Sequence, residues 1–522
     1  MRKFNVTGLC TPDEDYMVDI SGKVEQIKCL VDRRSYFTIN RARQYGKTTT
    51  FNELCKALAD EYIVISLSFQ GLGDEVFASS ELFCQSFVRQ LVQALQFTSA
   101  CADYIKEWND SDITSFKQLN RHITKMCEKE NLVLLIDEVD RTSNNRVFLH
   151  FIDMLRDKFL ARKAKRDYTF HSVILAGVYD IKNIKLKTIN EGTYTPTPTE
   201  GKLYNSPWNI AVNFNVDMSF SPAEISTMLS SYEADYKTGM NITAIAEEIR
   251  SYTNGYPFLV SRICQCIDEE LDMDWSHGGI QRAVKILLEE KNTLFDDIFK
   301  NLENNKTLYD FIYDLLILGA RKSFTISNPI IDLGHMYGFL EKRDGKVAIA
   351  NKIFELLMTE HFISKDESTV GGSRIGVLQY DVVKDGKFNM ELCLRKFAEH
   401  YGEIFNDNDT EFLERHGRLL FLSYLKPLIN GHGFYHIESQ FTDLRRMDIV
   451  VDFGPQQFVI ELKLWRGEQY QTDAYSQLCA YLESKHTDTG YLLTFDFRKD
   501  GNKVRKTEWI DVNGKRIFDV MV

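Results

Sequence analysis

Short apolar runs alternate with helical patterns from Tyr36 to about Gly177. The runs are YFTIN, YIVISLSF, LVLLID and SVILAGV, and helical periodicity, beginning with a helix from Lys47 to Asp60, fills the stretches between them. Apolar strands without polar alternation, separated by helices, are typical of a parallel sheet that is buried on both faces. The pattern therefore predicts an α/β domain with a parallel sheet in residues 1–221.

The alternation of apolar strands and helices ends in the middle of the chain. Residues 188–222 contain four of the nine prolines, which predicts a long surface insertion that ends near the core. Helical periodicity predicts a helical lid over residues 222–302. Helices and two short apolar runs around Asp344 and Gly345 predict a winged-helix-like module at residues 303–365. A small helical subdomain with a hairpin is the alternative.

A polar, Gly-rich stretch, SKDESTVGGSR, separates these helices from a second α/β pattern. It predicts a linker at residues 366–389 and a new domain at residues 390–522. That domain is expected to contain helices up to residue 429, a helix in TDAYSQLCAYLES, and strands in FYHIESQF, RMDIVVDF, QFVIELKLW and GYLLTFDF. The whole chain is therefore expected to be an α/β protein of several domains.

The composition is that of a folded protein without export or membrane signals. Hydrophobic residues make up 44% and charged residues 26%, and no apolar run approaches the length of a membrane span. The ten cysteines lack the paired spacing of zinc sites, so we expect reduced thiols and a cytoplasmic protein. The net charge of -12 argues against indiscriminate coating of nucleic acid. Basic clusters at residues 158–166 and 498–506 are either local contacts for nucleic acid or solvated faces.

The segment RARQYGKT, Arg41 to Thr48, follows the first apolar strand and precedes a helix. It matches the second half of the phosphate-binding loop GxxxxGK[ST], with Arg41 in place of the first glycine. Gly46 would let backbone amides approach the phosphates, Lys47 would reach the β- and γ-phosphates, and Thr48 would hold magnesium. The residues of this segment that we expect to bind the cofactor ATP are Arg43, Gly46, Lys47, Thr48 and Thr49.

The run LVLLIDEVD places two acids at the end of another predicted strand. Asp137 would bind magnesium and Glu138 would orient the attacking water, unless the acids are merely solvated. Together with AGVYDI and SPWNIAVNFNVDMSFS, these motifs resemble the prokaryotic AAA-ATPase-like proteins, close to the STAND-type P-loop ATPases. The resemblance covers about residues 8 to 235 and implies that Arg41 is a family trait. It also implies that the NGYP turn lies near the nucleotide, with Arg262 as either a phosphate sensor or an ordinary surface arginine.

Asp448, Glu461 and Lys463 lie in two predicted strands that a turn at Gly454 and Pro455 joins. In a hairpin of that length the carboxylates of Asp448 and Glu461 can meet, and Lys463 shares a face with Glu461. The two acids could hold one or two Mg²⁺ or Mn²⁺ ions, and the lysine could position or deprotonate the attacking water. A surface Glu–Lys pair on an edge strand is the alternative.

The next predicted helix carries Gln477 and Tyr481, which are four residues apart and share a face. The order strand-Asp, strand-ExK, helix-QxxxY, strand resembles the PD-(D/E)XK nuclease superfamily, in particular its QxxxY branch. The resemblance implies a restriction-endonuclease-like fold in which Gln477 and Tyr481 orient the lysine and contact the substrate backbone. It also implies an upstream helical acid that binds metal, for which Glu414 is the first choice and Glu411 the rival. Glu438 could join this site.

The sequence thus predicts an ATP-binding, metal-dependent nuclease that cleaves DNA under the control of a P-loop ATPase module. The fusion of the two domains resembles a family of uncharacterised bacterial proteins. The alternative is a nucleotide-dependent switch or DNA-binding regulator whose nuclease fold only binds. ATP-driven translocation is a third interpretation, against which the lack of further helicase motifs speaks. A homo-oligomer is compatible with this prediction, and no membrane partner is expected.

Overall fold

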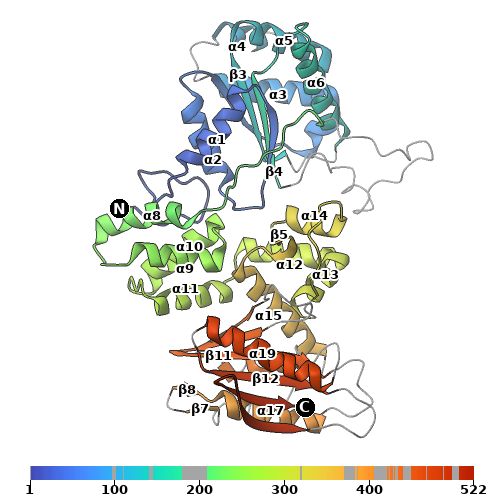
Figure 1. Ribbon diagram of the computed structural model, residues 1–522. Helices are drawn as coiled ribbons and strands as arrows, with labels where there is room; N and C mark the ends of the chain where they lie inside the picture. The colour runs from blue at the N-terminus through green and yellow to red at the C-terminus, as the bar shows by residue number, and fades with distance from the viewer. Residues whose placement is uncertain are drawn as a thin grey trace, which may run out of the picture. The chain divides into compact units, whose positions relative to one another are not determined.

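Two compact units make up the chain. In the computed structural model one unit consists of Met1–Leu294 and Asp332–Leu340, and the other of Phe295–Ile331 and Glu341–Val522. Figure 1 shows the elements of both. The structure describes residues 2–96, 102–109, 111–139, 145–178, 208–317, 320–369, 382–384, 386–404, 420–422, 424–426, 428–429, 433–438, 448–465, 467–485, 487–496 and 505–522.

The first unit contains a four-stranded sheet in which all strands run parallel. Its order is β1-β4-β3-β2, so that β4 lies between β1 and β3. All residues of β4 are buried, as expected for a strand with helices on both sides. The parallel sheet predicted for the first part of the chain is therefore confirmed. The strands are β1 (Tyr36–Asn40), β2 (Ile63–Ser68), β3 (Leu132–Asp137) and β4 (Ser172–Gly177).

Helices cover both faces of this sheet (Figure 1). On β3, Leu132, Leu134 and Ile136 belong to an apolar cluster built with α3, α5 and α6. The alternate residues face the opposite side, where α1 and α2 lie. These helices are α1 (Ser21–Asp32), α2 (Lys47–Leu58), α3 (Ser80–Leu95), α4 (Ala102–Asn109), α5 (Phe116–Lys129) and α6 (Arg146–Lys163), with a short 3₁₀ helix η1 (Asp74–Phe77).

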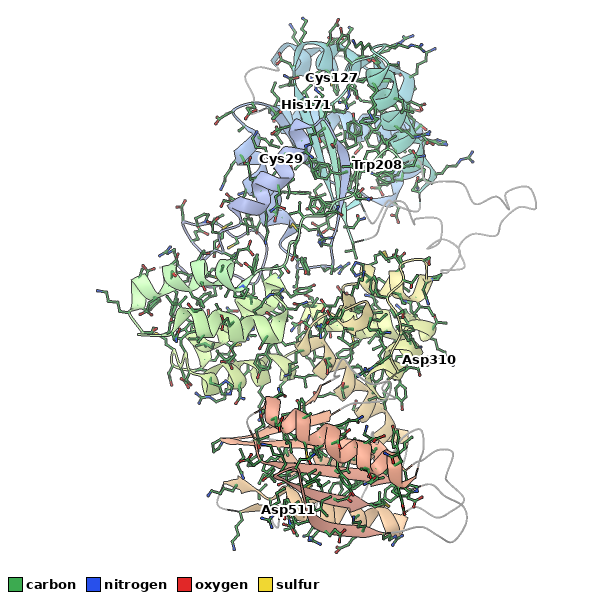
Figure 2. The ribbon with its side chains drawn as sticks, in the orientation of Figure 1. Cys29, Cys127, His171, Trp208, Asp310 and Asp511 are labelled. Carbon is green, nitrogen blue, oxygen red and sulfur yellow. The ribbon has the colours of Figure 1, made fainter. Side chains whose placement is uncertain are left out.

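Residues 208–212 lie against β1. The indole nitrogen of Trp208, which Figure 2 labels beside this sheet, donates to Thr38 Oγ1 at 3.0 Å. The amide of Val212 donates to the carbonyl of Tyr36 at 2.9 Å. The end of the predicted insertion therefore reaches the core, while residues 188–207 lie outside the described residues.

Helices follow one another over the range that we predicted to be a lid. The first begins with a capping box, in which the Ser221 hydroxyl accepts from the amide of Glu224, and the Glu224 carboxylate accepts from the amide of Ser221. Movement of these helices as a lid stays a prediction. They are α8 (Pro222–Tyr236), α9 (Ile242–Thr253), α10 (Pro257–Glu270), α11 (His277–Glu289) and α12 (Thr293–Asn304).

The range predicted as a winged helix contains further helices and a two-stranded hairpin. The hairpin turns at Asp344 and Gly345, both with positive φ, as an Asp-Gly turn requires. The winged-helix interpretation and the domain boundaries stay predictions, and residues 370–381 of the predicted linker lie outside the described residues. The elements are α13 (Lys306–Leu316), α14 (Pro329–Met336), β5 (Leu340–Arg343), β6 (Lys346–Ile349) and α15 (Lys352–Thr369).

The second unit contains a six-stranded mixed sheet of order β13-β14-β12-β11-β10-β9. Strands β9, β10 and β11 pair antiparallel, and β11, β12 and β14 pair parallel. We did not predict β13 and β14, although the Asn513-Gly514 turn between them, with positive φ at both residues, is a strong hairpin signal. The strands are β9 (Gly433–Glu438), β10 (Asp448–Phe453), β11 (Gln456–Leu464), β12 (Thr489–Phe495), β13 (Lys506–Val512) and β14 (Lys515–Met521); β7 (Val383–Lys384) and β8 (Lys387–Phe388) form a separate pair.

Two helices, α17 (Met390–Ile404) and α19 (Glu468–Ser484), pack against opposite faces of this sheet. Leu478 of α19 packs with Val459 of β11 in one apolar cluster. On the other face, the rings of Phe397 in α17 and Phe495 in β12 lie 6.3 Å apart. Because strand side chains alternate, Glu461 faces α19 as Val459 does. Within the described ranges, every helix is too short or too polar to cross a lipid bilayer.

Two members of the basic cluster at residues 158–166 have structural roles. Lys158 is buried, and its ammonium group donates to Thr124 Oγ1 and pairs with Asp167, both at 2.7 Å. Burial lowers the pKa of Lys158. Arg162 donates to the carbonyl of His171 at 2.9 Å. These contacts connect α6 to α5 and to the segment before β4, so the two groups already have partners within the domain.

We expect Lys158→Ala to lower the free energy of unfolding by about 3 kcal/mol, because it leaves the carboxylate of Asp167 without its buried partner. Urea-induced unfolding followed by circular dichroism measures this change. Arg166→Ala, at an exposed position just after the same helix, is the matched control and should change it by less than about 0.5 kcal/mol. Equal effects of the two substitutions would contradict the structural role of Lys158.

Candidate functional site

The loop between β1 and α2 is folded around the ammonium group of Lys47. Its Nζ donates to the carbonyl oxygens of Arg41 at 2.8 Å and Ala42 at 3.1 Å, and the side chain is buried. Gly46, the N-cap of α2, has a φ of 74°, which glycine adopts without steric cost. Because Gly46 offers no capping side chain, an anion can take that place at the start of α2.

Arg41, at the position of the missing first glycine, holds the loop to its surroundings. Its guanidinium donates to the carbonyl of Val216 at 2.8 Å and lies over the ring of Phe214 at 5.4 Å. Its amide donates to the carbonyl of Gly177, at the end of β4. Burial lowers the pKa of this guanidinium. Arg41 therefore anchors the loop to β4 and to residues 214–216, while Lys47 keeps its own contacts inside the loop.

The acids predicted to act with the loop lie at the carboxyl end of β3. Asp137 Oδ1 accepts from the amide of Glu138 at 2.8 Å. Glu138 has a φ of 56°, which is uncommon for a residue other than glycine and turns the chain sharply. Gln70, shortly after the neighbouring strand β2, lies near the same edge of the sheet. The carboxyl ends of parallel strands thus collect polar groups at one edge of the sheet.

A cavity of about 510 Å³ opens beside the loop. Its lining combines polar residues of the loop and of α2 with apolar side chains such as Val18, Phe220 and Phe258. The volume lies in the range of small-molecule pockets. A nucleotide would match this mixed lining, because its phosphates are charged and its base is flat and largely apolar.

The structure brings most of the predicted ATP-binding residues together at this cavity. The predicted residues that line it are Arg43, Gly46, Lys47, Thr48, Thr49 and Glu138. Asp137 is half-buried at the end of β3, directly before Glu138. The individual roles of these residues in binding and hydrolysis stay predictions.

We did not anticipate from the sequence that residues near the N-terminus contribute to the cavity. Side chains between Asn5 and Lys23 line it. The amide of Cys10 donates to Thr49 Oγ1 at 3.2 Å, and the Lys23 ammonium pairs with Glu224 of α8 at 2.5 Å. No motif marks this segment. Gln70, which also lines the cavity, could have been found, because it follows a parallel strand as Glu138 does.

The NGYP turn at the start of α10 reaches the loop, as the resemblance implied. The hydroxyl of Tyr256 donates to the carbonyl of Arg43, and Pro257 lines the cavity. Arg262, one helical turn later, has a different environment. Its guanidinium pairs with Glu290 at 2.8 Å and is not part of the lining. The geometry therefore favours a structural role for Arg262 over a phosphate sensor.

The segment Asp332–Leu340, which belongs to the first unit, also touches the loop. Gly338 approaches Ala42 so closely that a Cβ at residue 338 would lie 2.9 Å from the Cβ of Ala42. Its φ of 74° also favours glycine. Nearby, Gln44 Nε2 donates to Thr293 Oγ1 at 3.2 Å. The phosphate loop is therefore supported by residues outside the α/β core.

A second candidate site lies on the α19 side of the six-stranded sheet. Asp448 of β10 is directly opposite Glu461 of β11 in the antiparallel register. Opposite positions share a face, with Cβ atoms about 5 Å apart. The Glu461 carboxylate pairs with the Lys463 ammonium at 2.9 Å, and Lys463 also donates to Gln477 Oε1 of α19 at 3.4 Å.

Burial decides between the two interpretations of the Glu–Lys pair. Strand β11 lies between β10 and β12, and the side chains of Glu461 and Lys463 are 0% and 5% exposed. The alternative, a surface pair on an edge strand, is therefore wrong. Two charges inside a sheet cost free energy even when paired, so a pair at such a position is a candidate for chemistry.

The structure describes some of the other predicted members of this site and not others. Tyr481 is buried in the apolar cluster beneath α19. Glu438 is opposite Asp448 in the pairing of β9 with β10. Glu414 and Glu411 lie outside the described residues. In the part of the chain with described side chains, which excludes that of Asp448, no group of three or more His, Cys, Asp or Glu could hold a metal ion.

The first site defines a class of protein. A buried strand, a loop closed by glycine and lysine, a helix, and a further strand that ends in acids constitute a P-loop ATPase-like module. Comparison of sequences agrees, because the family described as "AAA-like domain" matches residues 23–277. That range contains the loop, both acids and the helices up to the start of α11.

The individual proteins that match the chain have low sequence identity to it. An uncharacterized WD repeat-containing protein of Synechocystis sp. (strain ATCC 27184 / PCC 6803 / Kazusa) is 21% identical over 350 residues, which are 62% of this chain. The chain spans only 27% of that relative's length. Solved structures that match include a Walker-type ATPase of Pyrococcus abyssi (12% identity, 68% of this chain, 99% of that chain, TM-score 0.44). Another is the ORC2 protein of Aeropyrum pernix in ADPNP–ADP complexes (10% identity, 69% of this chain, 98% of that chain, TM-score 0.36).

We expect Lys47→Ala to weaken ATP binding at least about tenfold, or about 1.4 kcal/mol, because it removes the cation held within the phosphate loop. Titration with a fluorescent ATP analogue measures the Kd. Lys56→Ala is the matched control, since Lys56 lies in the same helix and pairs with Glu53 away from the cavity. The same Kd for Lys47→Ala and the unsubstituted protein would contradict the assignment.

Proposed function

We propose that the protein is an ATP-controlled, Mg²⁺- or Mn²⁺-dependent nuclease that hydrolyses phosphodiester bonds of DNA. The first unit would bind ATP and hydrolyse it slowly, and the second unit would carry the cleavage site. A homo-oligomeric state would add a further level of control. The family match over residues 23–277 supports the P-loop ATPase-like module of the first unit.

The cavity of the first unit supports the ATP part of this proposal. Lys47 already satisfies its charge with carbonyl oxygens of its own loop, and these can be exchanged for phosphate oxygens, which are stronger partners. Thr48 and Asp137 would hold Mg²⁺ beside the phosphates, and Glu138 would orient the water that attacks the γ-phosphate. The apolar lining from the N-terminal segment would receive the base.

The single observation that carries the nuclease part is the register of β10 against β11. It puts Asp448 opposite Glu461, and Lys463, two residues later, is bound both to Glu461 and to Gln477 of the next helix. Carboxylate oxygens are the donors that Mg²⁺ prefers, so Asp448 and Glu461 fit such an ion, with Glu414 as the expected third ligand. A bound Mg²⁺ would lower the pKa of water and stabilise charge on the phosphate.

The residues of the chain would then act as follows. As an ammonium group Lys463 would donate a hydrogen bond to the attacking water, or as a neutral amine it would take the water's proton. Gln477 would keep the lysine in place. The oxygen of the attacking water would form the new bond to phosphorus while the bond from phosphorus to the sugar oxygen breaks. The proton of the attacking water would pass to Lys463 or to solvent, and the leaving oxygen would take a proton from solvent water. Tyr481 lies on the same helix, four residues from Gln477, and would support this arrangement through its packing.

We expect Asp448→Asn and Lys463→Met to abolish cleavage of plasmid DNA in the presence of Mg²⁺ or Mn²⁺, because each keeps the side-chain volume but removes the charge. Gel analysis with ATP, with ADP and without nucleotide measures cleavage. Asp473→Asn and Lys387→Ala, both at exposed positions of the same unit, are the matched controls and should retain it.

The outcome of this experiment also separates the two functions. If the unsubstituted protein cleaves no DNA under any of these conditions, the nuclease proposal is refuted. The alternative, a nucleotide-dependent switch or regulator that only binds DNA, would then be tested by DNA binding with ATP and with ADP. Cleavage that persists in Asp448→Asn would place the active site elsewhere.

We expect Glu138→Gln to slow ATP hydrolysis about 100-fold while the Kd for ATP stays unchanged, because the carboxylate would orient water and not hold phosphate. Phosphate release measures the rate. Glu128→Gln, an exposed acid near the end of α5, is the control. A rate equal to that of the unsubstituted protein would show that Glu138 has no part in hydrolysis.

A further inference from the structure

A buried carboxylate without a role in the proposed reaction lies beside the second site. Asp519 of β14 is fully buried. Its Oδ2 accepts from the Tyr475 hydroxyl at 2.5 Å and pairs with the Lys506 ammonium at 3.2 Å, and its Oδ1 accepts from Gln471 Nε2 at 3.3 Å. A charge at such a position is stable only with partners of this kind. Asp519 is therefore the centre of a polar cluster inside the domain.

Two of the partners of Asp519 belong to α19. Gln471 and Tyr475 are four residues apart and lie on one face of this helix. Gln471 also donates to Thr494 Oγ1 of β12 at 3.3 Å. Burial, and then the hydrogen bond to Asp519, raise the pKa of Tyr475, so the phenol keeps its proton and remains a donor. The first half of α19 is thereby attached to β12 and β14.

Other residues of α19 contact the second site. The Lys463 ammonium lies 5.5 Å from the ring centre of Tyr470 and donates to Gln477. Tyr470 and Gln477 are seven residues apart and so share a face, since two turns of helix contain about seven residues. Strand β12 separates β11 from β14, so the Lys463 and Asp519 contacts are about 10 Å apart across the sheet.

We infer that Asp519 is a positioning residue of the second site. It fixes the rotation of α19 about its axis and thereby sets the distance from Gln477 to Lys463. Apolar packing is non-directional and permits small rotations of a helix, whereas hydrogen bonds to a buried carboxylate are directional and resist them. At 3.4 Å the bond from Lys463 to Gln477 is long, so a small rotation breaks it. The catalytic meaning of this inference rests on the proposed nuclease function.

Two substitutions test the inference in the full-length protein. We expect Tyr475→Phe and Asp519→Asn to lower kcat for DNA cleavage at least about fivefold with KM unchanged, because the substrate is still bound but the lysine is misplaced. Both should also speed hydrogen exchange of the amides in residues 468–477. Tyr475→Phe removes only one oxygen, so it serves even if Asp519→Asn fails to fold. Thr472→Ala, on the exposed face of α19, should change neither quantity.

A double substitution separates positioning from general loss of stability. If Tyr475 acts through Gln477, then Tyr475→Phe should have no further effect on kcat in protein that already carries Gln477→Ala. Independent, multiplicative losses of kcat would overturn the inference. So would faster hydrogen exchange of α19 without any loss of kcat in Tyr475→Phe.

Failure of the proposed function gives a different result. If the unsubstituted protein cleaves no DNA, the nuclease proposal fails. Hydrogen exchange alone then tests whether Asp519 holds α19 in place. Faster exchange of residues 468–477 in Tyr475→Phe than in Thr472→Ala supports the attachment of α19 to Asp519. Equal exchange in these two variants overturns it.

Discussion

A buried positive charge at the start of α2 organises the N-terminal unit. The ammonium group of Lys47 has carbonyl oxygens of Arg41 and Ala42 as partners, so the loop must curl back over the start of α2. That curvature directs the N-terminus of α2 toward the cavity, which lies beside the carboxyl end of β3. The N-terminal segment, the start of α10 and the end of β3 all contribute to the same cavity, so its composition depends on this one loop.

The parts of the structure that depend on local patterns could be predicted from the sequence. Apolar runs defined the parallel sheet, because a strand between two helical layers has no polar face to show. The phosphate loop and Glu138 were found because their chemistry requires fixed residues at fixed spacing. Likewise, the pairing of Asp448 with Glu461 followed from the length of one hairpin. In each case the decisive contacts join residues that are close in sequence or that occur in a known order.

The parts that depend on distant contacts could not be predicted. Ten residues between Asn5 and Lys23 line the cavity beside the loop, yet their sequence contains no recognisable motif. Only their packing against α8 and the loop reveals them. The hairpin of β13 and β14 had a local signal in Asn513 and Gly514, but its sheet partner β12 lies elsewhere in the chain. The role of Asp519 could not be predicted from the sequence, because an acid in an alternating strand normally points to solvent. Burial beneath α19 changes its role entirely.

The contact between Gly338 and Ala42 has a consequence for protein synthesis. The two residues belong to one compact unit, but the intervening chain includes Phe295–Ile331, which belongs to the other. A chain leaves the ribosome from its N-terminus, and domains fold as units while it does so. The phosphate loop therefore emerges long before the residue that supports it. A nascent chain that ends before Gly338 carries the complete nucleotide-binding motif, but its loop lacks one wall of its final packing.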